Sequence, residues 1–128
     1  MKLGYVILYV PDIAKAASFY EAAFGLTSQF VAPSGQFAAM NTGDTVLGFA
    51  SESFVAGNVT DFARQRPGGD PQAVEIAFIA DDVAAAVERA ARAGATIVRQ
   101  PEVKPWGQTV AYVRDLNGAL VELCTKMG

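Results

Sequence analysis

The chain has 128 residues, of which 52% are hydrophobic and 18% are charged, and its net charge is −3. This length suits one compact core, and no apolar run approaches the ~20 residues that cross a bilayer. The small negative charge and the lack of a lysine or arginine run exclude an electrostatic surface for nucleic acid. We therefore expect a cytoplasmic protein that binds a small molecule, and neither nucleic acid nor a membrane.

Histidine is absent, and Cys124 is the only cysteine. These counts exclude a Ser–His–Asp triad, a Cys–His pair, a disulfide within the chain and any metal site built on imidazole. The apolar context LVELC predicts that Cys124 is a buried thiol. Carboxylates therefore become the main candidates for acid–base chemistry.

The first part of the chain predicts a strand, a helix and three further strands. The stretch LGYVILYV alternates between two faces, with Tyr5 and Tyr9 on the same one. Asp12 suits the N-cap of the following helix, and Gly25 suits its end. Three short strands, LTSQFVA, QFAAMNT and TVLGFAS, come next, separated by Pro-Ser-Gly and Gly-Asp turns.

The segment 52–73 is predicted to be a linker. It contains Gly57-Asn58 and the stretch RPGGDPQ, both of which are typical of turns. A single helical turn is expected around VTDFARQ. The linker separates two modules within one domain, at about 1–51 and 74–128.

The second part of the chain repeats the first with a shift of 70 positions. VEIAFIA is a predicted strand, and a helix over 83–93 follows between its cap Asp82 and Gly94. The stretches ATIVRQP, TVAYVRD and ALVELCT supply three more strands. Glu75 occupies the place that Tyr5 has in the first part. The pattern predicts an α+β fold made of two βαβββ modules.

Three stretches carry a family resemblance: YVPDIAKAASFYEAAFG, IADDVAAAVERAARAGA and KPWGQTVAYVRDLNGALVEL. They resemble the vicinal oxygen chelate superfamily, which includes glyoxalase I, bleomycin-resistance proteins, fosfomycin-resistance enzymes and extradiol dioxygenases. The resemblance implies that the modules form a curled mixed sheet around a cup, usually completed in a homodimer. It also implies metal-ligand positions on the first and last strand of each module, which here hold Tyr5, Leu47 or a neighbour, Glu75 and Glu122. Only Glu122 is the residue usual in the family.

The carboxyl groups of Glu75 and Glu122 leave two roles open. As hard oxygen ligands they suit weak binding of a divalent ion such as Mg²⁺ or Mn²⁺, whereas zinc, iron and nickel prefer imidazole or thiolate. Alternatively, Glu122 is hydrogen-bonded to a neighbour and Glu75 faces water. If the two groups converge, one of them should have a raised pKa. No cofactor and no transition metal are expected.

The other ligand-binding candidates are aromatic or amide side chains: Tyr5, Tyr9, Trp106 and Gln108. Trp106 belongs to a Pro-Trp-Gly loop, and the sequence leaves open whether it covers the cup mouth or plugs the sheet. The face on which Gln108 lies depends on a strand register that the sequence does not fix.

Two functions follow from these residues. The first is a binding protein similar to the bleomycin-resistance branch, whose apolar cup, including Leu47, holds an aromatic or cationic compound without a transition metal. The alternative is a lyase or isomerase of glyoxalase type, in which Glu75 or Glu122 is the catalytic base or a ligand of a hard metal. The absence of histidine disfavours dioxygenase chemistry.

Overall fold

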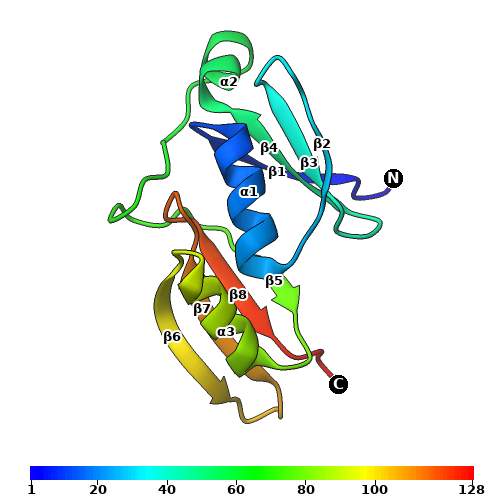
Figure 1. The fold of residues 1–128 in the computed structure, drawn as a ribbon, viewed down its shortest axis with the longest axis vertical. Coiled ribbons are helices and arrows are strands. Elements are labelled where there is room, and N and C mark those ends of the chain that lie inside the picture. The colour runs from blue at the N-terminus through cyan, green and yellow to red at the C-terminus, as the bar shows by residue number, and fades with distance from the viewer. The chain divides into compact units, whose positions relative to one another are not determined.

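The computed structural model describes residues 1–128 as two compact units, Met1–Arg64 and Gln65–Gly128. In each unit a helix lies across one face of a four-stranded mixed sheet (Figure 1). The predicted α+β class and the two βαβββ modules are confirmed, and the strands do not close into a barrel. None of the three helices is long and apolar enough to span a membrane.

Unit 1 holds the first four strands and two helices. Their bounds are β1 (Tyr5–Val10), α1 (Ile13–Phe24), β2 (Ser28–Val31), β3 (Phe37–Met40), β4 (Val46–Ser51) and α2 (Glu52–Asn58). The strand order is β1-β4-β3-β2, with β1 parallel to β4 and the other pairs antiparallel. The predicted caps of α1 are confirmed: Asp12 accepts a hydrogen bond from the Lys15 N–H at 3.0 Å, and Gly25 ends the helix with φ 70°.

The core of unit 1 lies between α1 and one face of its sheet. Tyr20 of α1 is fully buried, and its ring centroid is 5.0 Å from that of Phe49 on β4. Because side chains alternate along a strand, Leu47 shares this helix-covered face with Phe49. Gly48 and Ala50 lie on the opposite face.

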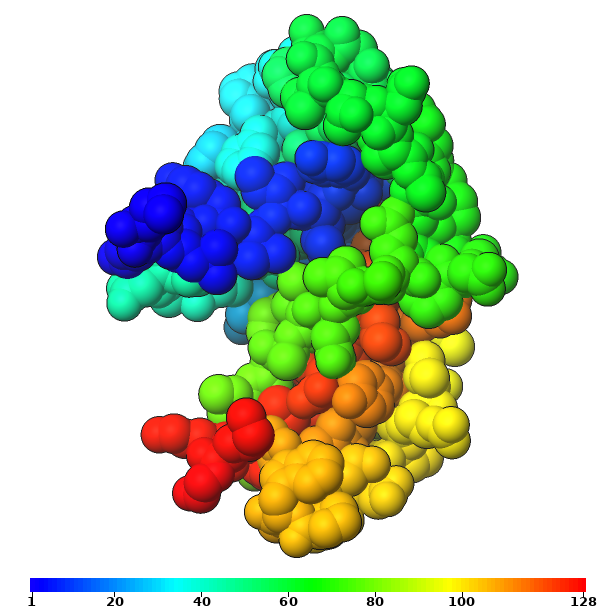
Figure 2. Space-filling view, turned by 180° about the vertical axis from the view of Figure 1, so that it is seen from behind, coloured from blue at the N-terminus to red at the C-terminus, as the bar shows by residue number.

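The opposite face of the unit 1 sheet is open and apolar. Tyr5, Ile7 and Tyr9 of β1 are 62%, 43% and 37% exposed. Figure 2 shows β1, in dark blue, uncovered on this side. Tyr9 has one aromatic neighbour, Phe62, whose ring centroid is 5.0 Å away.

The helix between the modules is not where the sequence predicted it. A helical turn was expected around VTDFARQ, but α2 begins directly after β4 and ends at Asn58. The Ser51 side chain accepts a hydrogen bond from the Phe54 N–H at 3.1 Å and so caps the helix. Val55 is buried, so tertiary packing against the sheet stabilises a helix that Gly57 alone would disfavour.

Unit 2 holds the other four strands and one helix. Their bounds are β5 (Ile76–Ile79), α3 (Val83–Arg92), β6 (Thr96–Val103), β7 (Thr109–Arg114) and β8 (Leu120–Cys124). The strand order, β5-β8-β7-β6, repeats that of unit 1. Asp82 caps α3, as predicted, by accepting from the Ala85 N–H at 3.0 Å. The fully buried Val113 and Val121 lie on the face that α3 covers.

The segment before β5 packs on the turn between β7 and β8. Gln65 is buried, and its side-chain carbonyl accepts from the Gln72 N–H at 3.1 Å. In the turn, Asp115 Oδ1 accepts from the backbone N–H groups of Asn117 and Ala119. A Cβ atom on Gly118 would lie 2.6 Å from the carbonyl oxygen of Arg66, and Gly118 has φ +89°. Glycine is therefore required here for both space and backbone conformation.

We expect Gly118→Ala to lower the free energy of unfolding by about 2–4 kcal/mol, because it adds a backbone clash to the strain of a positive φ. Gly35→Ala is a matched control, since Gly35 has φ +74° and open space around it. The control should cost about 1 kcal/mol. Urea denaturation of both variants checks this, and equal losses would show that Arg66 can move away from Gly118.

Candidate functional site

The candidate site lies on the face of the unit 2 sheet that α3 leaves open. The strand register places Ala77, Glu122 and Tyr112 side by side on β5, β8 and β7. Glu75 precedes Ala77 by two residues, so it points to the same side. The face thus carries two carboxyl groups and a phenol.

Glu75 and Glu122 carry neighbouring carboxyl groups on this face. The pKa of Glu75 is raised, first because partial burial against the sheet disfavours its charged form, and then by the charge of Glu122 and side-chain hydrogen bonding with it.

Glu122 accepts a hydrogen bond from a phenol. The Tyr112 hydroxyl donates to Glu122 Oε1 at 3.0 Å, whereas the Cys124 thiol donates to the Phe78 carbonyl oxygen at 3.6 Å. Burial, followed by the interactions with Glu122, raises the pKa of Tyr112 to about 12 and that of Cys124 to about 11. Both groups therefore keep their protons near neutral pH. Cys124 is a buried thiol, as its apolar context predicted.

Trp106 and Gln108 are linked to the end of β8. The Trp106 indole N–H donates to Gln108 Oε1 at 2.8 Å, and Gln108 Nε2 donates to the Thr125 carbonyl at 2.9 Å. The Gln108 amide is thus engaged within the protein on both its polar atoms. The Trp106 side chain itself remains 62% exposed. Figure 2 shows its loop, in orange, at the surface of unit 2.

The ligand position assigned to Leu47 or a neighbour falls on the neighbour, Gly48. Under the shift of 70 positions, Ile7 corresponds to Ala77. Ala77 pairs with Glu122, whereas Ile7 pairs with Gly48. Gly48 is therefore the counterpart of Glu122. Leu47 is one residue away, so it points to the α1 face, where it is 4% exposed.

The structure thus brings together Glu75 and Glu122, and it adds Tyr112, which the sequence analysis missed. The register of the β7–β8 hairpin is the signal that could have identified Tyr112 from the sequence. Arg114 pairs with Leu120 across the short turn, and counting back two pairs gives Tyr112 opposite Glu122. Tyr5 and Tyr9 lie on the open face of unit 1 instead.

Two βαβββ units, each with one helix-covered and one open sheet face, define a paired-module α+β protein. The model of the Glyoxalase/Bleomycin resistance protein/Dioxygenase superfamily matches residues 2–123, and the chain belongs to this superfamily. The family expected from the sequence is therefore confirmed. A search of curated proteins gave no significant match.

Solved structures support the same fold. A glyoxalase-related enzyme from Fulvimarina pelagi has a TM-score of 0.83 and 22% identity, over 98% of this chain and 88% of that one. A glyoxalase/bleomycin resistance protein/dioxygenase family enzyme from Burkholderia phytofirmans PsJN has a TM-score of 0.77 and 21% identity, over 98% of both chains. TioX from Micromonospora sp. ML1 has a TM-score of 0.75 and 24% identity, also over 98% of both chains.

The metal-ligand positions implied by the family do not fit a transition metal in this chain. In unit 1 these positions hold the phenol of Tyr5 and Gly48, the residue that corresponds to Glu122 of unit 2. A side chain at Gly48 would also meet the ring of Phe37, whose nearest atom is 2.7 Å from the position of a Cβ. No group of three or more His, Cys, Asp or Glu side chains is arranged to hold a metal ion. The raised pKa of Glu75 beside Glu122 is the chemical feature that these residues offer.

The raised pKa of Glu75 predicts a pH-dependent stability. Between the ordinary carboxyl pKa and the raised one, the native state binds the proton more tightly than the unfolded state, so stability falls as pH rises through this window. Glu75→Gln keeps a hydrogen-bond donor and removes the charge, so it should remove this fall.

Urea midpoints measured from pH 4 to pH 8 check the prediction. Glu88→Gln, which changes a carboxyl group on α3, is the control and should keep the pH dependence of the parent protein. A parent protein whose midpoint does not differ from that of Glu75→Gln at any pH would contradict the raised pKa of Glu75.

Proposed function

We propose that the protein binds a cationic small molecule and that the Glu75–Glu122 pair recognises the cation. The observation that carries this proposal is the placement of two neighbouring carboxyl groups on an open sheet face, where the charge of Glu122 raises the pKa of Glu75. Glu75 is exposed and Glu122 is half-buried, so a ligand has access to both. A cation bound between them would meet two carboxyl groups.

The surroundings of Glu122 favour binding without rearrangement. Tyr112 orients the Glu122 carboxyl group, because its hydroxyl donates to Glu122 Oε1 and keeps its proton near neutral pH. An anion held in place by fixed donors loses little conformational freedom when a ligand arrives.

An exposed aromatic ring on the same unit supports an aromatic ligand. The Trp106 indole is tied to Gln108 by its N–H, so the ring is oriented while most of it remains open to solvent. Such a ring offers a stacking surface to a planar cation. We propose an aromatic cation as the ligand class, bound without a metal or another cofactor. Tyr5 and Tyr9 would offer a comparable surface on unit 1.

The raised pKa of Glu75 also favours a second candidate, a metal-independent lyase or isomerase. A carboxyl group whose pKa lies above its usual range is a better proton carrier near neutral pH. In this function Glu75 is the catalytic base, and Glu122 adjusts its proton affinity. Exchange of a carbon-bound proton of a carbonyl substrate, lost in Glu75→Gln, would distinguish catalysis from binding alone.

The binding proposal predicts a pH-dependent affinity for a planar aromatic cation such as proflavine. Binding should tighten as pH rises through the raised pKa of Glu75, since deprotonation adds a negative charge to the site. It should weaken with salt. It should also quench the fluorescence of Trp106, the only tryptophan.

The double variant Glu75→Gln/Glu122→Gln should remove the pH dependence and weaken binding at least about tenfold. Asp44→Asn with Asp61→Asn removes the same charge from exposed positions of unit 1 and should leave binding unchanged. Equal affinities of the Glu75/Glu122 double variant and the parent protein would contradict the proposal.

We further propose that the chain is a homodimer. The open face of unit 1 exposes Tyr5, Ile7 and Phe30 at 62%, 43% and 48%, and monomers rarely leave such apolar patches uncovered. Light scattering at micromolar concentration should give about twice the 13.5 kDa chain mass. Ile7→Lys should give monomers, whereas Val59→Lys, at an exposed position outside the sheet, should not. A parent protein that stays monomeric would refute the dimer.

A further inference from the structure

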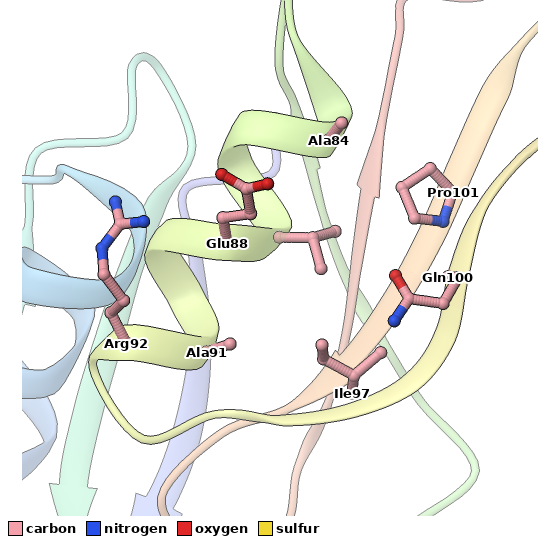
Figure 3. A pocket seen from close by; sticks show the side chains of 8 residues that line it. Ala84, Glu88, Ala91, Arg92, Ile97, Gln100 and Pro101 are labelled. Atoms are coloured by element: carbon pink, nitrogen blue, oxygen red, sulfur yellow. The ribbon is translucent and has the colours of Figure 1, made fainter.

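Unit 2 has a cavity on the face of its sheet opposite to the face that carries Glu122. It is a pocket of about 430 Å³ between α3 and β6, open to solvent (Figure 3). Its walls are mostly apolar and are formed by Ala84, Val87, Ala91, Ile97 and Pro101. This volume lies within the range of small-molecule sites, roughly 300–1,000 Å³.

Local sequence explains why the cavity exists. Alanines at positions 84 and 91 have short side chains, so α3 leaves space on the side that faces β6. The pairing of β6 with β7 is irregular, with register shifts between Ile97 and Arg99 and between Arg99 and Glu102. Such irregularities bend an edge strand, so β6 does not pack flat against the helix.

Two polar side chains line the solvent-exposed rim of this pocket. The amide of Gln100, which is exposed, points into the cavity (Figure 3). Glu88, also exposed, stands on α3 at the rim. Arg92 is one turn further along α3 and points away from the pocket (Figure 3). The pocket therefore combines apolar walls, an amide and a carboxylate.

We propose that this pocket binds a small primary amine with a branched aliphatic body. The body packs against Ala84, Ala91 and Ile97, the ammonium group pairs with Glu88, and the Gln100 carbonyl oxygen accepts a further hydrogen bond from it. The opposite charge of Glu88 selects an amine over a carboxylic acid, and the apolar walls select an aliphatic group. The site does not depend on Glu75 or Glu122, because these residues lie on the other face of the sheet.

The experiment is an amide-resolved NMR titration with 3-methylbutylamine, compared with the neutral 3-methylbutan-1-ol. The amine should shift the signals of residues 84–92 and 97–101 with an affinity in the millimolar range, as expected for so few heavy atoms. The alcohol should bind there about fivefold more weakly, since it lacks the ion pair.

Four variants separate the contributions. Glu88→Gln should weaken the amine about fivefold and leave the alcohol unchanged. Ala84→Leu keeps a good helix former, fills the cavity and should abolish both shifts. Arg92→Gln should not weaken the amine. Glu75→Gln/Glu122→Gln should leave the pocket shifts intact, so failure of the binding function proposed above would not be mistaken for failure here.

Three results would overturn the proposal. The first is an amine titration that leaves residues 84–92 and 97–101 unshifted. The second is equal binding of amine and alcohol that Glu88→Gln does not change. The third is unchanged binding in Ala84→Leu when its spectrum shows an intact fold.

Discussion

The approach of the Glu75 and Glu122 carboxyl groups on one sheet face is the constraint on which the proposed site depends. It requires the parallel pairing of β5 with β8, which sets Ala77 beside Glu122 and thereby brings Glu75 to the same face. It also requires the β7–β8 hairpin, whose turn places Tyr112 next to Glu122. Since Gly118 allows that turn to lie against the Arg66 carbonyl, the segment before β5 and the hairpin stabilise each other. The local packing of unit 2 thus positions the side chains of Glu75, Glu122 and Tyr112.

The two units repeat one fold but have different open faces. Unit 1 presents Tyr5, Ile7 and Tyr9, and Gly48 in place of a carboxyl group, so its open face is apolar. Unit 2 presents an acidic pair and a phenol that donates to Glu122. Two modules with matching ligands could hold a metal ion, but this chain has no histidine, and in unit 1 the position that corresponds to Glu122 holds Gly48. The acidic groups of the candidate site therefore come from unit 2.

The sequence predicted those parts of the structure that local patterns determine. The repeat at 70 positions, the caps Asp12 and Asp82, and the family were all accessible, because capping and strand alternation leave strong signals. Predictions failed where one residue of register matters: Leu47 was chosen instead of Gly48, and Tyr112 was overlooked. The helix α2 was misplaced because its packing outweighs its composition. The cavity between α3 and β6 was not foreseen, since it arises from irregular pairing that no short motif marks.

The most direct test of the account is a ¹³C NMR titration of the side-chain carboxyl carbon of Glu75. Its midpoint should lie above the ordinary glutamate pKa of about 4.3. Glu122→Gln should lower this midpoint, because it removes the charge that acts on Glu75. A midpoint of Glu75 at the ordinary value, unchanged in Glu122→Gln, would contradict the convergence of the two carboxyl groups, and with it the proposed cation site.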